Sequence, residues 1–197
     1  RKGGMSSLFY TPQSGIWKSV WMESVPEAYI ESVQITPMYD DASVKVKVNT
    51  IGSKKTLTLT VLESGNEVSK VSVDSESEAV ICLGEFKAWS PENPFLYDLR
   101  VNYGEDEVVS YFGMRKFSVG RDKEGILRFY MNNRPFFFNV VLDQGYWPES
   151  LLTAPTEEAL QYDILKLKEL GYNTIRKHIK IEPDRFYYLC DKLGMIV

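Results

Sequence analysis

The stretches SVKVKVN (residues 43–49) and TLTLTV (residues 56–61) decide the fold of this chain, because apolar and polar side chains alternate along both. Successive side chains of a β-strand point to opposite faces, so each stretch has one apolar face and one polar face. Similar alternation returns near residues 99–101. The pattern predicts half-buried strands. The expected core comprises Val44, Val46, Val48, Leu57, Leu59, Val61, Leu99 and Val101.

Turn signals divide the region around these stretches into short strands. Ser64-Gly65-Asn66 separates two apolar runs, and Gly104-Glu105-Asp106-Glu107 separates two more. About seven short strands over roughly 90 residues, with no helical period, are typical of an immunoglobulin-like β-sandwich. We therefore assign residues 27–117 to one sandwich domain. Trp89, Phe95 and Tyr97 stand beside two prolines, and we expect them to close one end of the sandwich rather than to bind sugar.

The residues before the sandwich, 1–26, form a short separate stretch. Ser14-Gly15-Ile16 indicates a turn that leads into a strand, on which Trp17, Ser19 and Trp21 would share one face. One strand cannot bury two tryptophans alone. It is expected either to join the sandwich or to belong to a sheet of a preceding domain.

The period changes again in residues 118–197. Two apolar runs at 126–131 and 136–141 are joined by Asn132-Asn133-Arg134-Pro135, which indicates a hairpin. Thr156 is an expected N-cap of a helix with Leu160, Ile164, Leu167 and Leu170 on one face, and Gly171 is its expected stop. A short strand at 172–175, a second helix from Pro183 to Gly194 and a strand beginning at Met195 follow. Strand, helix and strand in alternation predict a parallel sheet.

Composition narrows the class of protein. The 197 residues carry a net charge of −4 and show no basic stripe, so nucleic acid is not an expected partner. No apolar run approaches the roughly 20 residues that span a bilayer, so no membrane partner is expected. Cys82 and Cys190 are too few for a disulfide framework or a zinc site, and both are expected to be buried free thiols. No ligand cluster implies a metal or another cofactor.

Several strings resemble glycoside hydrolase family 2, which comprises β-galactosidases, β-glucuronidases and β-mannosidases. Trp89-Ser90-Pro91-Glu92-Asn93-Pro94 is the most specific of them and is similar to the family signature within the sandwich. The matching strings also follow one another in the order found in the family, which strengthens the resemblance. The other matching strings are Ser14-Gly15-Ile16-Trp17, Phe112-Gly113-Met114-Arg115, Asn132-Asn133-Arg134-Pro135-Phe136, Asn173-Thr174-Ile175-Arg176 and Tyr188-Leu189-Cys190-Asp191.

The resemblance implies a domain order. Residues 1–26 would be the last strand of an N-terminal jelly-roll domain, and residues 27–117 the immunoglobulin-like sandwich. Residues 118–197 would be the start of an incomplete catalytic (β/α)8 TIM barrel. The sequence departs from the family after the second barrel strand, where Arg176-Lys177-His178 stands in place of Arg-x-x-His-Tyr-Pro. The loop after the first barrel strand, residues 142–148, departs as well, which leaves the sugar open.

The resemblance also implies a reaction. Retaining glycoside hydrolysis needs two carboxylates about 5–5.5 Å apart, and in this family both are glutamates on later barrel strands. We expect no catalytic residue in this chain, so that it would be an inactive fragment of a β-galactosidase-like enzyme acting on a carbohydrate. A periplasmic or secreted location is expected rather than a cytoplasmic one. Unpaired barrel strands would allow the fragment to self-associate.

Two loops supply candidate substrate-binding residues, since barrel enzymes build their sites at the carboxyl ends of strands. The first loop holds Asp143, Gln144 and Trp147, a set of acid, amide and indole groups suited to a sugar. The alternative for this loop is an ordinary connection whose tryptophan fills a domain contact. The second loop holds Arg176 and His178. There the alternatives are a structural ion pair for the arginine and a structural hydrogen bond for the histidine.

A different class of function competes with the enzyme. The rival is a non-catalytic sandwich module, for carbohydrate binding or for spacing of domains, formed by the strands of residues 27–117. The C-terminal tail would then be a separate element. An adhesion protein built of repeated sandwiches is less well supported, because the sequence contains no internal repeat.

Overall fold

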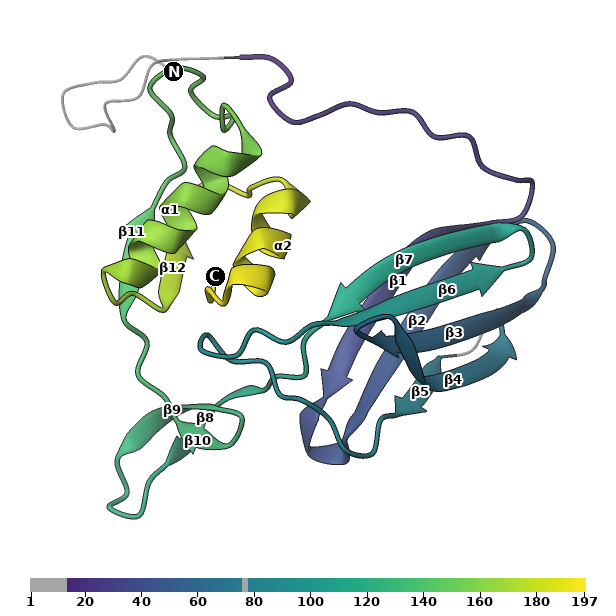
Figure 1. Cartoon of the computed structure of the whole chain (residues 1–197), viewed down its shortest axis with the longest axis horizontal. Coiled ribbons are helices and arrows are strands. Elements are labelled where there is room, and N and C mark those ends of the chain that lie inside the picture. Colours follow the sequence, from purple (N-terminus) through teal and green to yellow (C-terminus); the bar gives the residue numbers. More distant parts are fainter. Residues whose placement is uncertain (1–13, 76–77) are drawn as a thin grey trace.

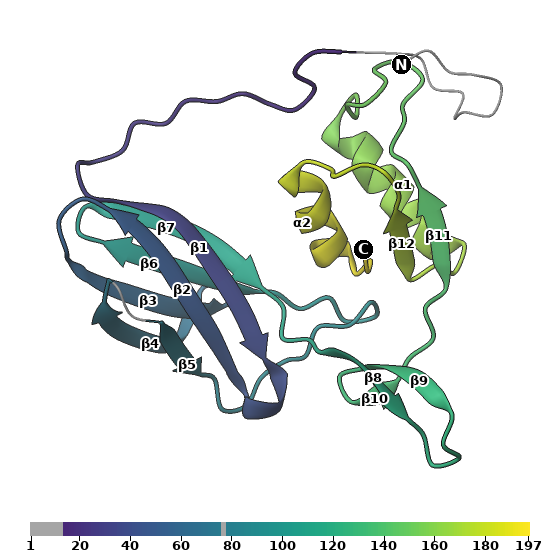
Figure 2. The same ribbon diagram turned by 180° about the vertical axis from the view of Figure 1, so that it is seen from behind.

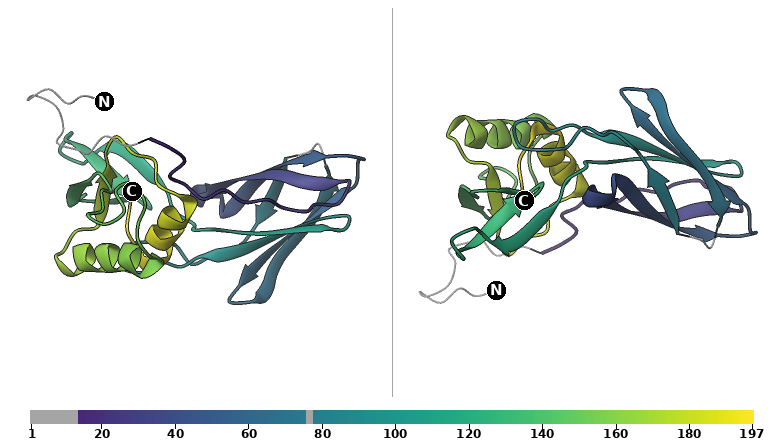
Figure 3. Two further views of the ribbon diagram at one scale, coloured as in Figure 1. Left: turned by 90° about the horizontal axis from the view of Figure 1, so that it is seen from above. Right: turned by 90° about the horizontal axis from the view of Figure 1, so that it is seen from below.

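The computed structural model describes residues 14–75 and 78–197. It shows a two-sheet sandwich at one end of an elongated molecule and a strand–helix unit at the other, with a small sheet beside them (Figure 1). Figure 3 shows the same division from above and below. The fold is mainly β, as expected. The sandwich strands are β1 (Tyr29–Met38), β2 (Ser43–Ile51), β3 (Thr56–Glu63), β4 (Asn66–Asp74), β5 (Ala79–Cys82), β6 (Tyr97–Tyr103) and β7 (Asp106–Phe112), with a short 3₁₀ turn η1 (Tyr39–Asp41) after β1.

The sandwich consists of a three-stranded sheet, β1-β2-β5, and a four-stranded sheet, β4-β3-β6-β7. All neighbouring strands in both sheets are antiparallel (Figure 2). Because side chains alternate along each strand, only one apolar face of each sheet is turned inward. The predicted strand register is confirmed, since every expected core residue is buried. The buried set includes Val44, Val46, Val48, Leu57, Leu59, Val61, Leu99 and Val101.

The turns of the sandwich follow their residue chemistry. Ser64 and Gly65 connect β3 to β4, and both have positive φ, at 50° and 84°. Two positive φ values in a two-residue hairpin match the twist of antiparallel strands, and glycine adopts them without steric cost. Gly104, with φ of 65°, occupies the first position of the turn between β6 and β7. Both predicted hairpins are therefore confirmed.

The strand expected near Trp17 and Trp21 does not join the sandwich, so that alternative is wrong, whereas a place in the sheet of a preceding domain stays a prediction. Residues 14–26 contain no strand, and Trp21 is 74% exposed. This segment crosses between the two ends of the molecule in an extended path (Figure 1). A strand needs a neighbour to pair with, and no described strand pairs with this segment. The remainder of the expected first region, residues 1–13, lies outside the described residues.

A small antiparallel sheet follows the sandwich. Its strands are β8 (Phe117–Arg121), β9 (Leu127–Met131) and β10 (Arg134–Pro135), and Asn132 and Asn133 form the predicted turn between the last two. A single strand was expected at 136–141. The structure instead has β11 at Val140–Asp143, which begins four residues later. Phe136 and Phe138 pack against Met131 and Trp89 in a separate apolar cluster, and the amide of Phe136 still donates to the carbonyl of Phe129 at 2.9 Å.

The strand–helix unit forms a parallel pair with two helices, as the alternation predicted. β11 pairs in parallel with β12 (Thr174–Lys177), and α1 (Glu157–Glu169) connects them. α2 (Asp184–Leu193) follows, and Thr174 then forms a parallel bridge with Ile196. Thr156 caps α1 by accepting a hydrogen bond from the amide of Ala159 at 3.2 Å.

The two helices bury an apolar cluster of their own. α1 and α2 pack against each other and against β12, so the main apolar side chains are buried. This cluster comprises Leu160, Ile164, Ile175, Phe186, Leu189, Cys190 and Met195, with Leu167 and Leu193 partly buried beside it. Leu170, which was expected on the same helical face, is 73% exposed because it is the residue at which the helix ends.

The two cysteines differ from each other. Cys190 is buried as expected, and burial raises the pKa of its thiol to about 12. Cys82 is exposed, so the expectation that both thiols are buried is wrong. It ends β5, where inward and outward side chains alternate, and its position falls on the outward side.

The helices are short. α1 has 13 residues and α2 has ten. Among the described residues, no helix combines the length and the apolar character that crossing a bilayer requires.

The sandwich core generates the first prediction. Leu59 is fully buried, so Leu59→Ala should lower the free energy of unfolding by about 3 kcal/mol through lost burial and a residual cavity. Val109 is 61% exposed, and Val109→Ala should change the same quantity by less than about 0.5 kcal/mol. Urea denaturation followed by tryptophan fluorescence measures both variants. Equal losses would contradict the assigned register.

Candidate functional site

The candidate loops follow the carboxyl ends of two neighbouring parallel strands. Asp143 ends β11 and lies opposite Lys177, which ends β12. The loops that follow therefore start side by side, although about 34 residues separate them in the sequence. His178 donates its backbone amide to the carbonyl of Asp143 at 2.9 Å, which extends the contact one residue beyond the strands.

A buried network of charges joins the two loops. The Lys177 ammonium group lies 2.5 Å from Oδ2 of Asp143 and 2.7 Å from Oε1 of Glu182. Lys180 reaches the same oxygen of Glu182 at 3.0 Å. The side chains of Lys177, Lys180 and Glu182 are at most 6% exposed. Buried charges are tolerated only when they are paired, so these residues hold one another in place.

Gly145 makes this network possible. Its φ is 60°, and a Cβ atom at this position would lie 2.1 Å from Oε1 of Glu182. Its amide donates to Oδ1 of Asp143 at 2.7 Å, and its carbonyl accepts from Nζ of Lys180 at 2.5 Å. Lys180 also donates to the carbonyl of Leu152 at 2.6 Å. Burial lowers the pKa of Lys180, and the hydrogen bond to Glu182 opposes that shift.

The structure brings Gln144 and His178 together, one from each predicted loop. Nε2 of Gln144 donates to Nδ1 of His178 at 2.9 Å, which requires the imidazole tautomer whose Nδ1 carries no proton. Oε1 of Gln144 is buried and has no hydrogen-bond partner among the described residues. An amide and an imidazole in contact can together donate to and accept from a hydroxyl group.

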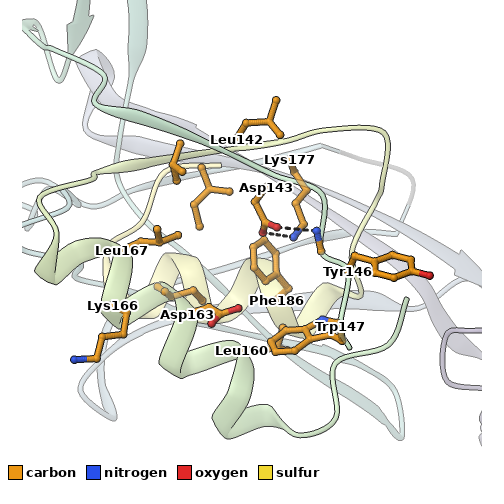
Figure 4. Close-up of a pocket in the computed structure, with 14 residues that line it drawn as sticks. Leu142, Asp143, Tyr146, Trp147, Leu160, Asp163, Lys166, Leu167, Lys177 and Phe186 are labelled. Carbon is orange, nitrogen blue, oxygen red and sulfur yellow. Dashed lines mark hydrogen bonds and ion pairs between the residues drawn. The ribbon is translucent and has the colours of Figure 1, made fainter. Parts of the chain in front are cut away.

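Arg176 stands apart from these residues. It lies opposite Leu142 in the β11–β12 register, and both side chains are exposed. Since side chains alternate, Arg176 and Leu142 face away from Asp143 and Lys177. Figure 4 shows Leu142 on the far side of the strand from the ion pair. The face of the sheet that carries Arg176 is not covered by described residues, as the exposure of Val140 and Leu142 shows.

Trp147 lines a cavity of about 260 Å³ between β11 and α1. Leu160 and Phe186 share this cavity, and Figure 4 shows the indole beside Leu160. Asp163 projects into it from α1, and burial raises the pKa of this carboxyl, with a smaller contribution from the charge of Asp143. The cavity lies on the helix side of the sheet, so Trp147 and Arg176 do not meet.

The sequence analysis missed Lys177, Lys180 and Glu182. Their alternation with apolar residues resembles an ordinary solvated strand, and no periodic signal marks them as buried. One signal could have pointed to these three residues. They are charged and lie at or directly after the end of a parallel strand, where the loops of neighbouring strands converge. Among the described residues, no group of three or more His, Cys, Asp or Glu side chains is arranged to hold a metal ion.

The sandwich identifies the family. Residues 28–115 match the family model described as glycosyl hydrolases family 2. The resemblance inferred from the local strings is confirmed by this match, which covers the sandwich.

Curated relatives extend the similarity to most of the chain. A β-galactosidase of Vibrio vulnificus (strain YJ016) is 30% identical over 208 aligned positions, which cover 93% of this chain and 20% of the relative. A β-galactosidase of Clostridium acetobutylicum is 27% identical, over 92% of this chain and 21% of the relative. The chain thus spans about a fifth of the length of these relatives.

Solved structures agree with this assignment. A β-glucuronidase of Faecalibacterium prausnitzii superposes with a TM-score of 0.75 at 27% identity, covering 86% of this chain and 27% of that chain. The apo structure of β-glucuronidase 3 from Bacteroides uniformis gives a TM-score of 0.75 at 25% identity, covering 87% of this chain and 22% of that chain. Sandwich and strand–helix unit are therefore arranged in this chain much as they are in these glycosidases.

The buried network generates the second prediction. Lys177→Met keeps most of the side-chain volume but leaves Asp143 and Glu182 without the shared cation. It should lower the free energy of unfolding by roughly 3 kcal/mol, because Asp143 loses its cation and Glu182 keeps only Lys180 as a partner. Thermal unfolding followed by circular dichroism measures the change.

Lys166→Met is the matched control, since Lys166 pairs with Glu169 on the surface of α1. It should change stability by less than about 1 kcal/mol. A loss for Lys177→Met no larger than that of this control would show that the network contributes little to the fold.

Proposed function

We propose that this chain forms part of a retaining glycoside hydrolase that cleaves a β-linked glycoside, with a β-galactoside as the first candidate substrate. The observation that carries the proposal is the family match over residues 28–115. The β-galactosidase relatives support the choice of sugar. The β-glucuronidases among the similar structures make a β-glucuronide the second substrate to test.

We further propose a domain order for the chain. Residues 27–117 form the immunoglobulin-like sandwich, and residues 118–197 form the opening of a (β/α)8 barrel. The parallel β11–α1–β12 arrangement supports the barrel, because parallel strands connected by a helix are its repeating unit. Residues 1–26 would end a preceding jelly-roll domain. A spacer or sugar-binding sandwich leaves the parallel unit unexplained, and no observation favours it.

The described acids of the two loops are poor candidates for catalysis. Asp143 and Glu182 are each paired with a buried lysine, so neither is free to attack a sugar or to donate a proton. Two carboxylates that flank the scissile bond are required for retention. The resemblance assigns them to later barrel strands, and we propose that the 197-residue chain alone is inactive.

For substrate binding we propose two groups at the strand ends. Gln144 and His178 would contact a sugar hydroxyl as a pair, and Asp143 would hold His178 in position through its backbone carbonyl. Arg176, exposed on the open face of the sheet, would orient a carboxylate of the completed site. Trp147 would support the first loop from the cavity side rather than stack on the sugar ring.

Two assays test the reaction class. The isolated chain should hydrolyse neither nitrophenyl β-galactoside nor nitrophenyl β-glucuronide, whereas the product of an extended reading frame should hydrolyse one of them. The sequence beyond residue 197 should contain an Asn-Glu pair after a fourth barrel strand. If the longer protein lacks this pair and shows no activity, the proposed glycoside hydrolase function is refuted. Turnover by the isolated chain that disappears on mutating one of its own residues would refute the proposed inactivity.

The role of Arg176 is tested in that longer enzyme. Arg176→Ala should lower kcat/KM by on the order of tenfold to hundredfold, the usual effect of losing a charged hydrogen-bond donor. Arg185→Ala is the control, because Arg185 is a surface cation that pairs with Glu157 on α1. If both variants have the same kcat/KM and unchanged stability, Arg176 is not part of the substrate-binding site.

A further inference from the structure

Asp191 on α2 lies at the contact between the strand–helix unit and the sandwich. Its Oδ1 accepts a hydrogen bond from Nη1 of Arg115 at 2.5 Å, and its Oδ2 accepts from the hydroxyl of Tyr111 at 3.1 Å. Tyr111 belongs to β7, and Arg115 follows that strand closely. Both oxygens of one helix carboxylate are thus held by the sandwich, and charged hydrogen bonds of this kind are strong and directional.

Trp89 binds the backbone of the same residue. Its Nε1 donates to the carbonyl of Asp191 at 2.7 Å, and its indole is fully buried. The guanidinium group of Arg115 lies 4.4 Å from the centre of the Trp89 ring. The side chain of Asn132 donates to the carbonyl of Trp89 at 2.9 Å, which attaches the small sheet to the same point.

Two glycines show that this contact is closely fitted. A Cβ atom on Gly113 would lie 3.0 Å from Cβ of Trp89. A Cβ atom on Gly194, at the end of α2, would lie 2.3 Å from the carbonyl oxygen of Pro91. Lys168 on α1 donates to that same carbonyl at 2.8 Å. Both helices therefore meet the loop that carries Trp89, with no room for an added side chain.

From these contacts we infer that Asp191 is a positioning residue that holds the strand–helix unit in one orientation on the sandwich. Three donors from the sandwich, on Tyr111, Trp89 and Arg115, converge on this single residue. Because α2 packs on β12, which pairs with β11, fixing α2 also fixes the direction in which the carboxyl ends of β11 and β12 face. The inference concerns the geometry of the chain and holds whether or not the proposed glycosidase function is correct.

The orientation can be measured with two spin labels. Cys82 is exposed on the sandwich and supplies the first site, whereas Cys190 is buried and, with its pKa raised to about 12, should not react. Leu165→Cys on the outer side of α1, where the native side chain is 49% exposed, supplies the second site. Pulsed electron paramagnetic resonance then gives the distance distribution between the sandwich and the helices.

The parent chain should give one narrow distance distribution. Asp191→Ala should broaden it or add a second distance, and should raise the rate of limited proteolysis between residues 112 and 140 by on the order of tenfold, as expected for the loss of charged hydrogen bonds. Asp184→Asn also removes a negative charge from α2 but lies on its exposed first turn, so it should leave both measurements unchanged.

A second variant keeps the test decisive if Asp191→Ala unfolds α2. Trp89→Phe retains a buried aromatic ring, and it removes the donor to Asp191 together with part of the ring volume. It should broaden the distribution while the circular dichroism of both units stays native. A narrow, unshifted distribution in every folded variant would overturn the inference, because the two units would then be oriented without Asp191.

Discussion

The fully buried indole of Trp89 is the contact on which the arrangement of this chain depends. The sandwich and the strand–helix unit each have their own apolar core. Trp89 belongs to a third cluster, with Met131 of the small sheet and Ile196 after α2. A large ring with one polar atom suits such a place, because it fills the contact and also forms one directional hydrogen bond. The specific Trp-Ser-Pro-Glu-Asn-Pro string therefore has a structural explanation that does not involve sugar.

The second constraint is the placement of charge at the ends of the parallel strands. Lys177 and Lys180 carry two buried positive charges, and Glu182 and Asp143 supply the matching negative charges. Such a network is costly to bury and becomes still more costly when one member is removed. It joins the two loops, and Gln144 and His178 meet beside it in a partly buried contact. In this part of the chain, the carboxylates organise the loops, and the neutral polar pair is the group we propose for a ligand.

The two faces of the β11–β12 pair have different neighbours. One face is covered by α1 and α2, and the other exposes Val140, Leu142 and Arg176. An exposed apolar face on a parallel pair is unusual, since parallel sheets are normally covered on both sides. The family match and the fraction of each relative that this chain spans agree with the proposal that further strands complete this sheet.

Local sequence patterns predicted most of the strands, turns and helix ends of this protein. The alternation at residues 43–49 and 56–61 predicted the sandwich register, and the Ser64-Gly65 and Asn132-Asn133 turns were predicted from backbone preferences. Thr156 and Gly194 marked helix ends correctly. These features follow from interactions within a few residues, which a single sequence contains.

Only the tertiary structure decided how distant residues meet. The sequence identified Asp143, Gln144, Trp147, Arg176 and His178 as one candidate group, but the structure divides them between the two faces of a sheet and a cavity. It also supplied Lys180 and Glu182 to the site, and it brought Asp191 to Trp89 across 102 positions of the chain. The strand expected near Trp17 did not join the sandwich for the same reason, because a strand forms only where a partner lies beside it. Pairing, burial of charge and the choice of sheet face depend on neighbours that are remote in sequence, and local patterns carry no information about which neighbours those are.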